Sequence, residues 1–109
     1  MCDFSEISNE LVNFRNERDW DKFHNPKDLA LAINIEAGEL LELFLWKGAD
    51  EANQAKVKEE LADVFCYAFL LAEKYGFDVK QIIMDKIKLN AEKYPVEKSK
   101  GTSKKYNEL

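Results

Sequence analysis

Residues 29–39, with the sequence LALAINIEAGE, and residues 60–72, with the sequence ELADVFCYAFLLA, decide the fold of this 109-residue chain. Each stretch combines an apolar run with two acidic residues three positions apart, Glu36 and Glu39 in the first and Glu60 and Asp63 in the second. Residues at this spacing project from adjacent points on one helix face. The two stretches therefore predict a pair of helices, each carrying two carboxylates beside its apolar residues.

The four carboxylates together predict a metal site. Like charges beside a core raise the free energy of a fold unless a cation neutralises them. Antiparallel packing of the two helices would bring all four into one cluster, and oxygen ligands suit Mg²⁺, with Mn²⁺ as a substitute. One such pair alone would be an ordinary solvated helix face, but a second pair with matching spacing favours a metal-dependent enzyme that acts on phosphates.

The remaining sequence predicts two further helices and no strand, so the fold class is all-α. Asn25 followed by Pro26 is typical of a helix start, Gly76 of a helix end, and Asp78 of a second start. Helical periodicity and these signals predict a four-helix bundle with helices over residues 5–19, 26–46, 51–75 and from Asp78 to just before Pro95.

Residues 1–96 are expected to form one helical domain, and residues 97–109 a basic, flexible C-terminal tail. The run Val64–Ala72 has no polar face, and such a helix needs cover on every side. A chain of this length has a modest core. We therefore expect a dimer or a dimer of dimers, the alternative being that this helix is central in a monomeric bundle.

Composition and charge limit the other partners. The net charge of −5 argues against general binding to nucleic-acid polymers or membrane surfaces. The N-terminus does not resemble a secretory signal, and the longest apolar run is too short to cross a bilayer. Cys2 and Cys66 form no disulfide framework, so reduced thiols in a cytoplasmic protein are expected.

Several other kinds of site lack the residues that they require. The only histidine is His24, outside both acidic pairs, which argues against di-iron and most zinc chemistry. No glycine-rich phosphate loop is present. Trp20 and Trp46 lie beside turn-forming residues, where each indole could stack on a nucleobase while His24 donates a hydrogen bond. The alternative is that these aromatic residues seal the ends of the bundle.

Residues 36–46 and 59–64 resemble the two halves of the MazG-like nucleotide pyrophosphohydrolase motif, which is Glu-x-x-Glu, a spacer and Glu-x-x-Asp. The flanking sequence is most similar to the dCTP pyrophosphatase branch of that family. It comprises Glu17-Arg18-Asp19-Trp20, Phe23-His24 and Pro26 on one side, and Lys86-Ile87-Lys88-Leu89-Asn90, Lys93-Tyr94-Pro95 and Ser103-Lys104-Lys105-Tyr106 on the other. The likeness covers about residues 14–109.

The resemblance implies an all-α enzyme that uses Mg²⁺ to hydrolyse a nucleoside triphosphate to the monophosphate and pyrophosphate. It implies that Glu36, Glu39, Glu60 and Asp63 bind the metal and serve catalysis. It also implies a base pocket formed by Trp20, His24 and Trp46, phosphate or sugar contacts from Lys86 and Asn90, and a site lined by Tyr94.

We therefore expect a pyrophosphohydrolase that prefers dCTP or a modified dCTP. The same chemistry on another base, such as dUTP, is one alternative. A helical regulatory module that binds nucleotide or metal without turnover is a second, although the presence of all four acids favours catalysis.

Overall fold

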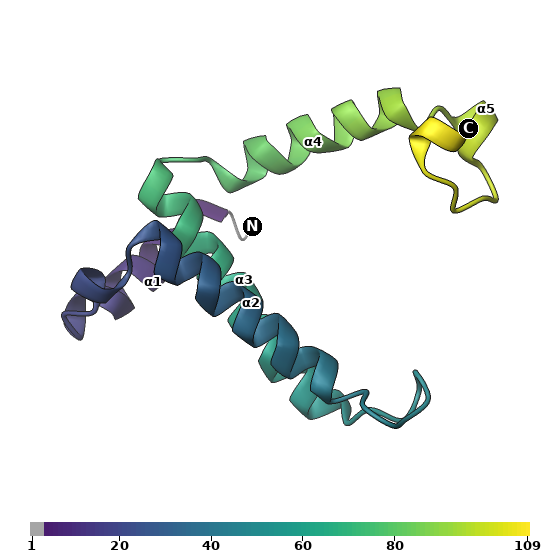
Figure 1. The fold of residues 1–109 in the computed structure, drawn as a ribbon. Helices are drawn as coiled ribbons and strands as arrows, with labels where there is room; N and C mark the ends of the chain where they lie inside the picture. The colour runs from purple at the N-terminus through teal and green to yellow at the C-terminus, as the bar shows by residue number, and fades with distance from the viewer. Residues whose placement is uncertain (1–3) are drawn as a thin grey trace. The chain divides into compact units, whose positions relative to one another are not determined.

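The computed structural model describes residues 4–109, and every regular element in that range is helical (Figure 1). The four long helices are α1 (Phe4–Glu17), α2 (Pro26–Glu42), α3 (Gln54–Tyr75) and α4 (Val79–Lys93). The three short elements are the 3-10 turn η1 (Asp21–Phe23), α5 (Val96–Ser99) and the 3-10 turn η2 (Tyr106–Glu108). The predicted all-α class is confirmed for the described residues.

The chain divides into two compact units, Met1–Phe77 and Asp78–Leu109. The first contains α1, η1, α2 and α3, and the second contains α4, α5 and η2. Inside the second unit, the Tyr106 ring of η2 lies edge-on to Tyr94, with 6.2 Å between centroids. Two helical turns thus fall within the expected tail, while its flexibility and the domain boundary at residue 96 stay predictions.

Side-chain caps fix where three helices begin. The Asn25 side chain accepts a hydrogen bond from the Asp28 backbone N–H at 2.9 Å, and Pro26 occupies the first position of α2. Asp78 accepts from the Gln81 N–H at 3.0 Å in the same way and opens α4. These predicted caps are confirmed. Asn53 makes a further cap, which was not predicted, so α3 begins at Gln54 rather than at residue 51.

Two helices end earlier than their apolar residues suggest. Helix α1 ends at Glu17 rather than residue 19, because Asp19 adopts a left-handed φ of 55°. Helix α2 ends at Glu42 rather than residue 46, where the next amides donate to carbonyls three residues back and tighten the chain into turns. Trp46 completes this reversal with a φ of 61°. The predicted end of α3 at Gly76 is confirmed, with a φ of 69°.

The core of the first unit lies between α2 and α3, which run side by side (Figure 1), while α1 packs against α3. Its buried apolar residues are Leu29 of α2 and Phe69, Leu70 and Ala72 of α3. They come from the start of α2 and the end of α3, as antiparallel packing requires. Because three of these four residues lie in the C-terminal half of the run Val64–Ala72, that run supplies most of the core.

Much apolar surface of the same helices remains open. Phe65 is 56% exposed although it belongs to the run Val64–Ala72, and Leu41 of α2 is 70% exposed. Apolar side chains left open in this way become a binding surface where they lie together in a patch. Separately, none of the described helices combines the length and apolar character needed to cross a membrane.

Candidate metal and nucleotide site

Antiparallel packing of α2 and α3 gathers three of the four predicted carboxylates. One oxygen from each of Glu36, Glu60 and Asp63 lies within 4.8 Å of the others. Glu39 is exposed, one helical turn after Glu36, and its negative charge acts on both Glu36 and Glu60. The structure therefore places all four acids in one neighbourhood, with three of them close enough to share a small cation. Their roles in metal binding and catalysis stay predictions.

The carboxyl groups of Glu36 and Glu60 resist ionisation, since the pKa of each is raised. Burial, the adjacent carboxyl groups of Glu60 and Glu39, and the charge of Asp63 raise the pKa of Glu36 to about 7. The adjacent Glu36 acts to lower the pKa of Glu60, but burial and the charges of Glu39 and Asp63 outweigh it, so that pKa is also raised. The metal-free cluster therefore retains protons that isolated carboxyl groups would have lost.

Two observations indicate that the residues of this cluster are suited to binding a divalent cation. The Oε2 atoms of Glu36 and Glu60 are buried and have no hydrogen-bond partner among residues 4–109. Buried carboxylate oxygens are normally paired, so each is available to a ligand. The donors are all carboxylate oxygens, which hard cations such as Mg²⁺ and Mn²⁺ prefer. The residues present therefore fit such an ion.

The predicted base-binding residues Trp20 and His24 flank the turn η1, at one end of the α2–α3 pair. His24 is half-buried, and its ring lies 6.5 Å from that of Tyr67 on α3. Its Nδ1 atom is buried without a partner in the described part of the chain. Trp20 is 43% exposed and lies edge-on to Phe14. The Trp20 indole is therefore open to a ligand, whereas the Nδ1 atom of His24 is shielded from solvent and has no partner of its own.

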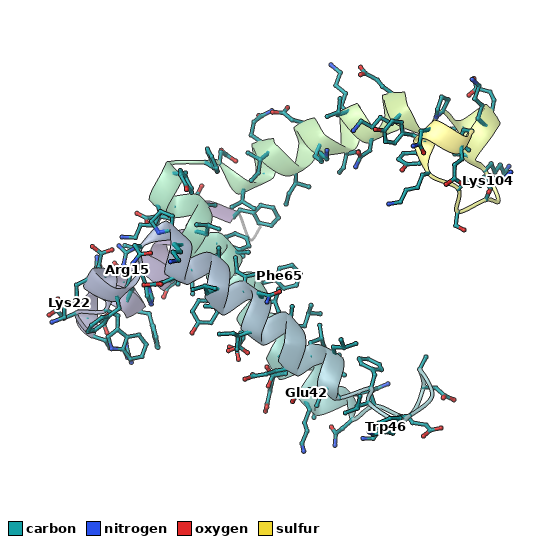
Figure 2. The ribbon with its side chains drawn as sticks, viewed as in Figure 1. Arg15, Lys22, Glu42, Trp46, Phe65 and Lys104 are labelled. Carbon is teal, nitrogen blue, oxygen red and sulfur yellow. The ribbon has the colours of Figure 1, made fainter. Side chains whose placement is uncertain are left out.

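Trp46 lies at the other end of the same helix pair (Figure 2). Helix α2 contains 17 residues. At the standard rise per residue, a helix of that length separates its ends by about 25 Å. A nucleobase is far smaller than this distance, so the structure does not bring Trp46 to Trp20 and His24 within one chain. Trp46 is 94% exposed and displays almost its whole ring.

The remaining predicted site residues belong to the second unit. Lys86 and Asn90 are exposed on α4, and Tyr94 follows as the C-cap of that helix. Their spacing of four residues places them along one face of α4. Their roles in binding phosphate, sugar or base stay predictions.

Tyr67 is a neighbour of the candidate site that the sequence did not indicate. It follows Asp63 by one helical turn, and its ring is the contact of His24. Burial and the charges of Glu36, Asp63, Cys66 and Glu39 raise the pKa of its phenol. The Tyr67 phenol thus lies within range of the charges of the cluster, while its ring contacts His24. The four-residue spacing from Asp63 was the available signal, but the residue lies inside an apolar run that predicts core.

Cys66 beside Tyr67 is a free thiol, and Cys2 lies outside the described residues.

Comparison with known proteins identifies the family. Residues 31–109, which include both acidic pairs, match the MazG-like family. The chain belongs to the MazG-like family. This MazG-like chain is 36% identical to a pyrophosphatase of known crystal structure from Archaeoglobus fulgidus, with a TM-score of 0.78 over 84% of this chain and 91% of that one.

Curated relatives of this MazG-like chain carry a more specific name. It is 40% identical to dCTP pyrophosphatase 1 of Mus musculus and 38% identical to that of Homo sapiens, each over 106 residues and 90% of this chain. The resemblance to the dCTP pyrophosphatase branch is therefore confirmed. The chain spans 62% of the length of these two relatives.

Proposed function

We propose that this chain hydrolyses a nucleoside triphosphate, preferentially dCTP or a modified dCTP, to the monophosphate and pyrophosphate in the presence of Mg²⁺. The observation that carries the proposal is the cluster of Glu36, Glu60 and Asp63, with two buried oxygens that lack a partner. Relatives named as pyrophosphatases support the reaction, and those named for dCTP support the substrate.

The four carboxylates divide into three that would bind the ion and one that would accept a proton. Glu36, Glu60 and Asp63 would hold the ion, which when bound offsets negative charge on the triphosphate. Glu39 lies outside the three-oxygen group but close enough to act on Glu36 and Glu60. We assign to Glu39 the acceptance of a proton from the water that attacks the α-phosphorus. Pyrophosphate then leaves as the bond from the α-phosphorus to the bridging oxygen breaks.

The base pocket would be completed by a second copy of the chain. Trp46 is almost fully exposed just after the end of α2, whereas Trp20 and His24 lie before its start. A two-fold axis that sets two α2–α3 pairs antiparallel brings the Trp46 end of one copy to the His24 end of the other. The exposed apolar residues Leu41 and Phe65 would be covered in the same association. We therefore infer a dimer, alone or within a tetramer, as the active form.

One experiment tests the reaction and the substrate together. The purified chain is incubated with each of the four common deoxynucleoside triphosphates, dUTP and 5-methyl-dCTP, with Mg²⁺ or with EDTA. Chromatography separates the monophosphate from the diphosphate, and an assay that distinguishes pyrophosphate from phosphate identifies the bond that is broken. We expect the monophosphate and pyrophosphate, formed fastest from a cytosine nucleotide and only with Mg²⁺.

Release of phosphate instead would refute pyrophosphate as the leaving group. A clear preference for dUTP or another base would retain the chemistry and overturn the substrate. Binding without any product would favour the regulatory module considered above.

A further inference from the structure

A charged cluster ties the segment that carries Trp20 and His24 to α3. Arg15 of α1 donates to Glu73 Oε2 of α3 at 2.9 Å, and the same nitrogen lies 3.3 Å from Asp21 Oδ1 of η1. Asp21 also accepts a hydrogen bond from Lys74 of α3. Two cations and two carboxylates thus connect α1, η1 and α3.

Arg15 is the buried member of this cluster. Only 7% of its side chain is exposed, and it is the only charged residue in the described chain that is buried. A guanidinium group is retained in such a position only when its charge is paired. By contrast, Lys22, which follows Asp21 in η1, pairs with Asp19 at 3.0 Å while both side chains remain exposed. The exposed pair is worth little to stability, whereas the contacts of Arg15 are shielded from solvent.

The backbone transmits the position of Asp21 to the two aromatic residues beside it. Trp20 directly precedes Asp21, and its N–H donates to the Arg15 carbonyl at 3.0 Å. The N–H of His24 donates to the Asp21 carbonyl, also at 3.0 Å. Fixing the Asp21 side chain against α3 therefore fixes both ends of η1. The His24 ring is then held against Tyr67, which gives this segment a second contact with α3 beside that of Asp21.

We propose that Arg15 is a positioning residue for nucleotide binding: by joining Asp21 of η1 to Glu73 of α3, it holds His24 against Tyr67 in the orientation that receives a substrate base. The role of His24 in base binding rests on the proposed function above, whereas the coupling of Arg15 to His24 does not. We assign neither Arg15, which is buried, nor Asp21 a contact with the substrate, so both would act through His24.

Kinetics with a double-mutant cycle tests the proposal in the full-length chain. For Arg15→Met, and for Asp21→Asn at a residue whose side chain is 53% exposed, we expect the KM for dCTP to rise about fivefold to tenfold. We expect kcat to stay within about twofold because the carboxylate cluster is unaltered. The matched control Lys22→Met, which removes an exposed cation from the same turn, should leave both constants within about twofold of the wild type.

The cycle distinguishes positioning from general stabilisation. In a His24→Ala background, Arg15→Met should change KM by less than about twofold, because the group that it positions is already absent. A folded Arg15→Met protein with an equal rise in KM in both backgrounds would overturn the proposal. If Arg15→Met does not fold, Asp21→Asn carries the same comparison.

A second measurement needs no turnover. His24 is the only histidine in the sequence, so a ¹⁵N-histidine-labelled chain gives a single imidazole spectrum by NMR. Burial and the positive charges of Arg15 and Lys74 lower the pKa of His24, against the opposing charge of Asp21, while the Tyr67 ring faces it from α3.

In Arg15→Met the loss of a cation and the release of η1 should both raise that pKa, and in Lys22→Met it should be unchanged. An unchanged His24 pKa in folded Arg15→Met would overturn the proposal even if catalysis is confirmed. A wild-type chain that hydrolyses no nucleotide would overturn the proposed function alone.

Discussion

Glu36 of α2 faces Glu60 of α3, and in each carboxyl group the Oε2 atom is buried without a hydrogen-bond partner among residues 4–109. Two such groups repel each other strongly when both are ionised, and neither Oε2 atom has a donor among these residues to replace the water lost on burial. The metal-free fold therefore carries an electrostatic cost at this position. A divalent cation would remove both the repulsion between the carboxylates and the cost of their lost hydration.

Neutralising one carboxylate should remove activity without unfolding the chain. For Asp63→Asn and Glu39→Gln we expect Mg²⁺-dependent pyrophosphate release to fall at least about 100-fold, which corresponds to about 2.7 kcal/mol of transition-state stabilisation. The melting temperature without metal should stay the same or rise, because repulsion within the cluster decreases. Glu59→Gln, which removes an exposed acid from the same helix, is the matched control. Turnover near the wild-type rate in both variants would show that the site is assigned wrongly.

Binding of Mg²⁺ should displace a proton from the cluster. The pKa of Glu36 is raised to about 7, so this group is about half protonated at pH 7, and coordination requires its ionised form. Calorimetric titration at pH 7 in buffers of different ionisation enthalpy should therefore show release of at least about half a proton per chain. The release should be smaller in Glu36→Gln. Identical binding enthalpies in all buffers would contradict the prediction.

Stability of the metal-free chain should fall as the pH rises. For Glu36 the folded pKa of about 7 exceeds the ordinary value of 4.5, so between these values the folded state binds more protons than the unfolded state. The free energy of unfolding then decreases with increasing pH across this window. Thermal melts between pH 5 and 8 with EDTA should show this slope, and Glu36→Gln should flatten it. A melting temperature that instead rises through the window would mean that the cluster is not coupled as described.

Mixing two impaired variants should restore activity if the base pocket is shared between copies. Loss of one stacking indole costs roughly 1–3 kcal/mol, so Trp20→Ala and Trp46→Ala should each lower catalytic efficiency by about one to two decades. After subunit exchange in equal amounts, half of the dimers are mixed, and each contains one site with both tryptophans. Efficiency should recover to about a quarter of the wild-type value.

The control for this mixture is the oligomeric state itself. Light scattering should give a mass of at least twice the 12.7 kDa of one chain for the wild type and both variants. A stable folded monomer, or a mixture no more active than its components, would contradict a base pocket that combines Trp20 of one copy with Trp46 of the other.

Local signals in the sequence predicted most of the helices and the break at residues 20–25, but they missed the turn at residues 43–46 that leads to Trp46. Asn25 and Gly76 act through neighbours only a few residues away, so their caps can be recognised from the sequence. Residues 43–46 are apolar and resemble the continuation of a helix. Their turn depends on a left-handed backbone at Trp46, a conformation that bulky residues rarely adopt and that the sequence therefore does not indicate. Arg15 resembles an ordinary surface charge because Glu73, its partner, lies 58 positions away. The acidic pairs could be recognised because the two acids of each pair are only three residues apart, and because the two helices that carry them follow one another in the chain.

The left-handed backbone at Asp19 and Trp46 has a consequence for attempts to engineer this protein. Both φ angles are positive, a conformation that glycine adopts freely and other residues only at a cost. A stability-guided redesign would therefore replace Trp46 with glycine or asparagine and gain a higher melting temperature. The same change would delete the most exposed aromatic ring of α2 and its following turn. Selection for thermal robustness and selection for ligand recognition would thus act in opposite directions on a single codon.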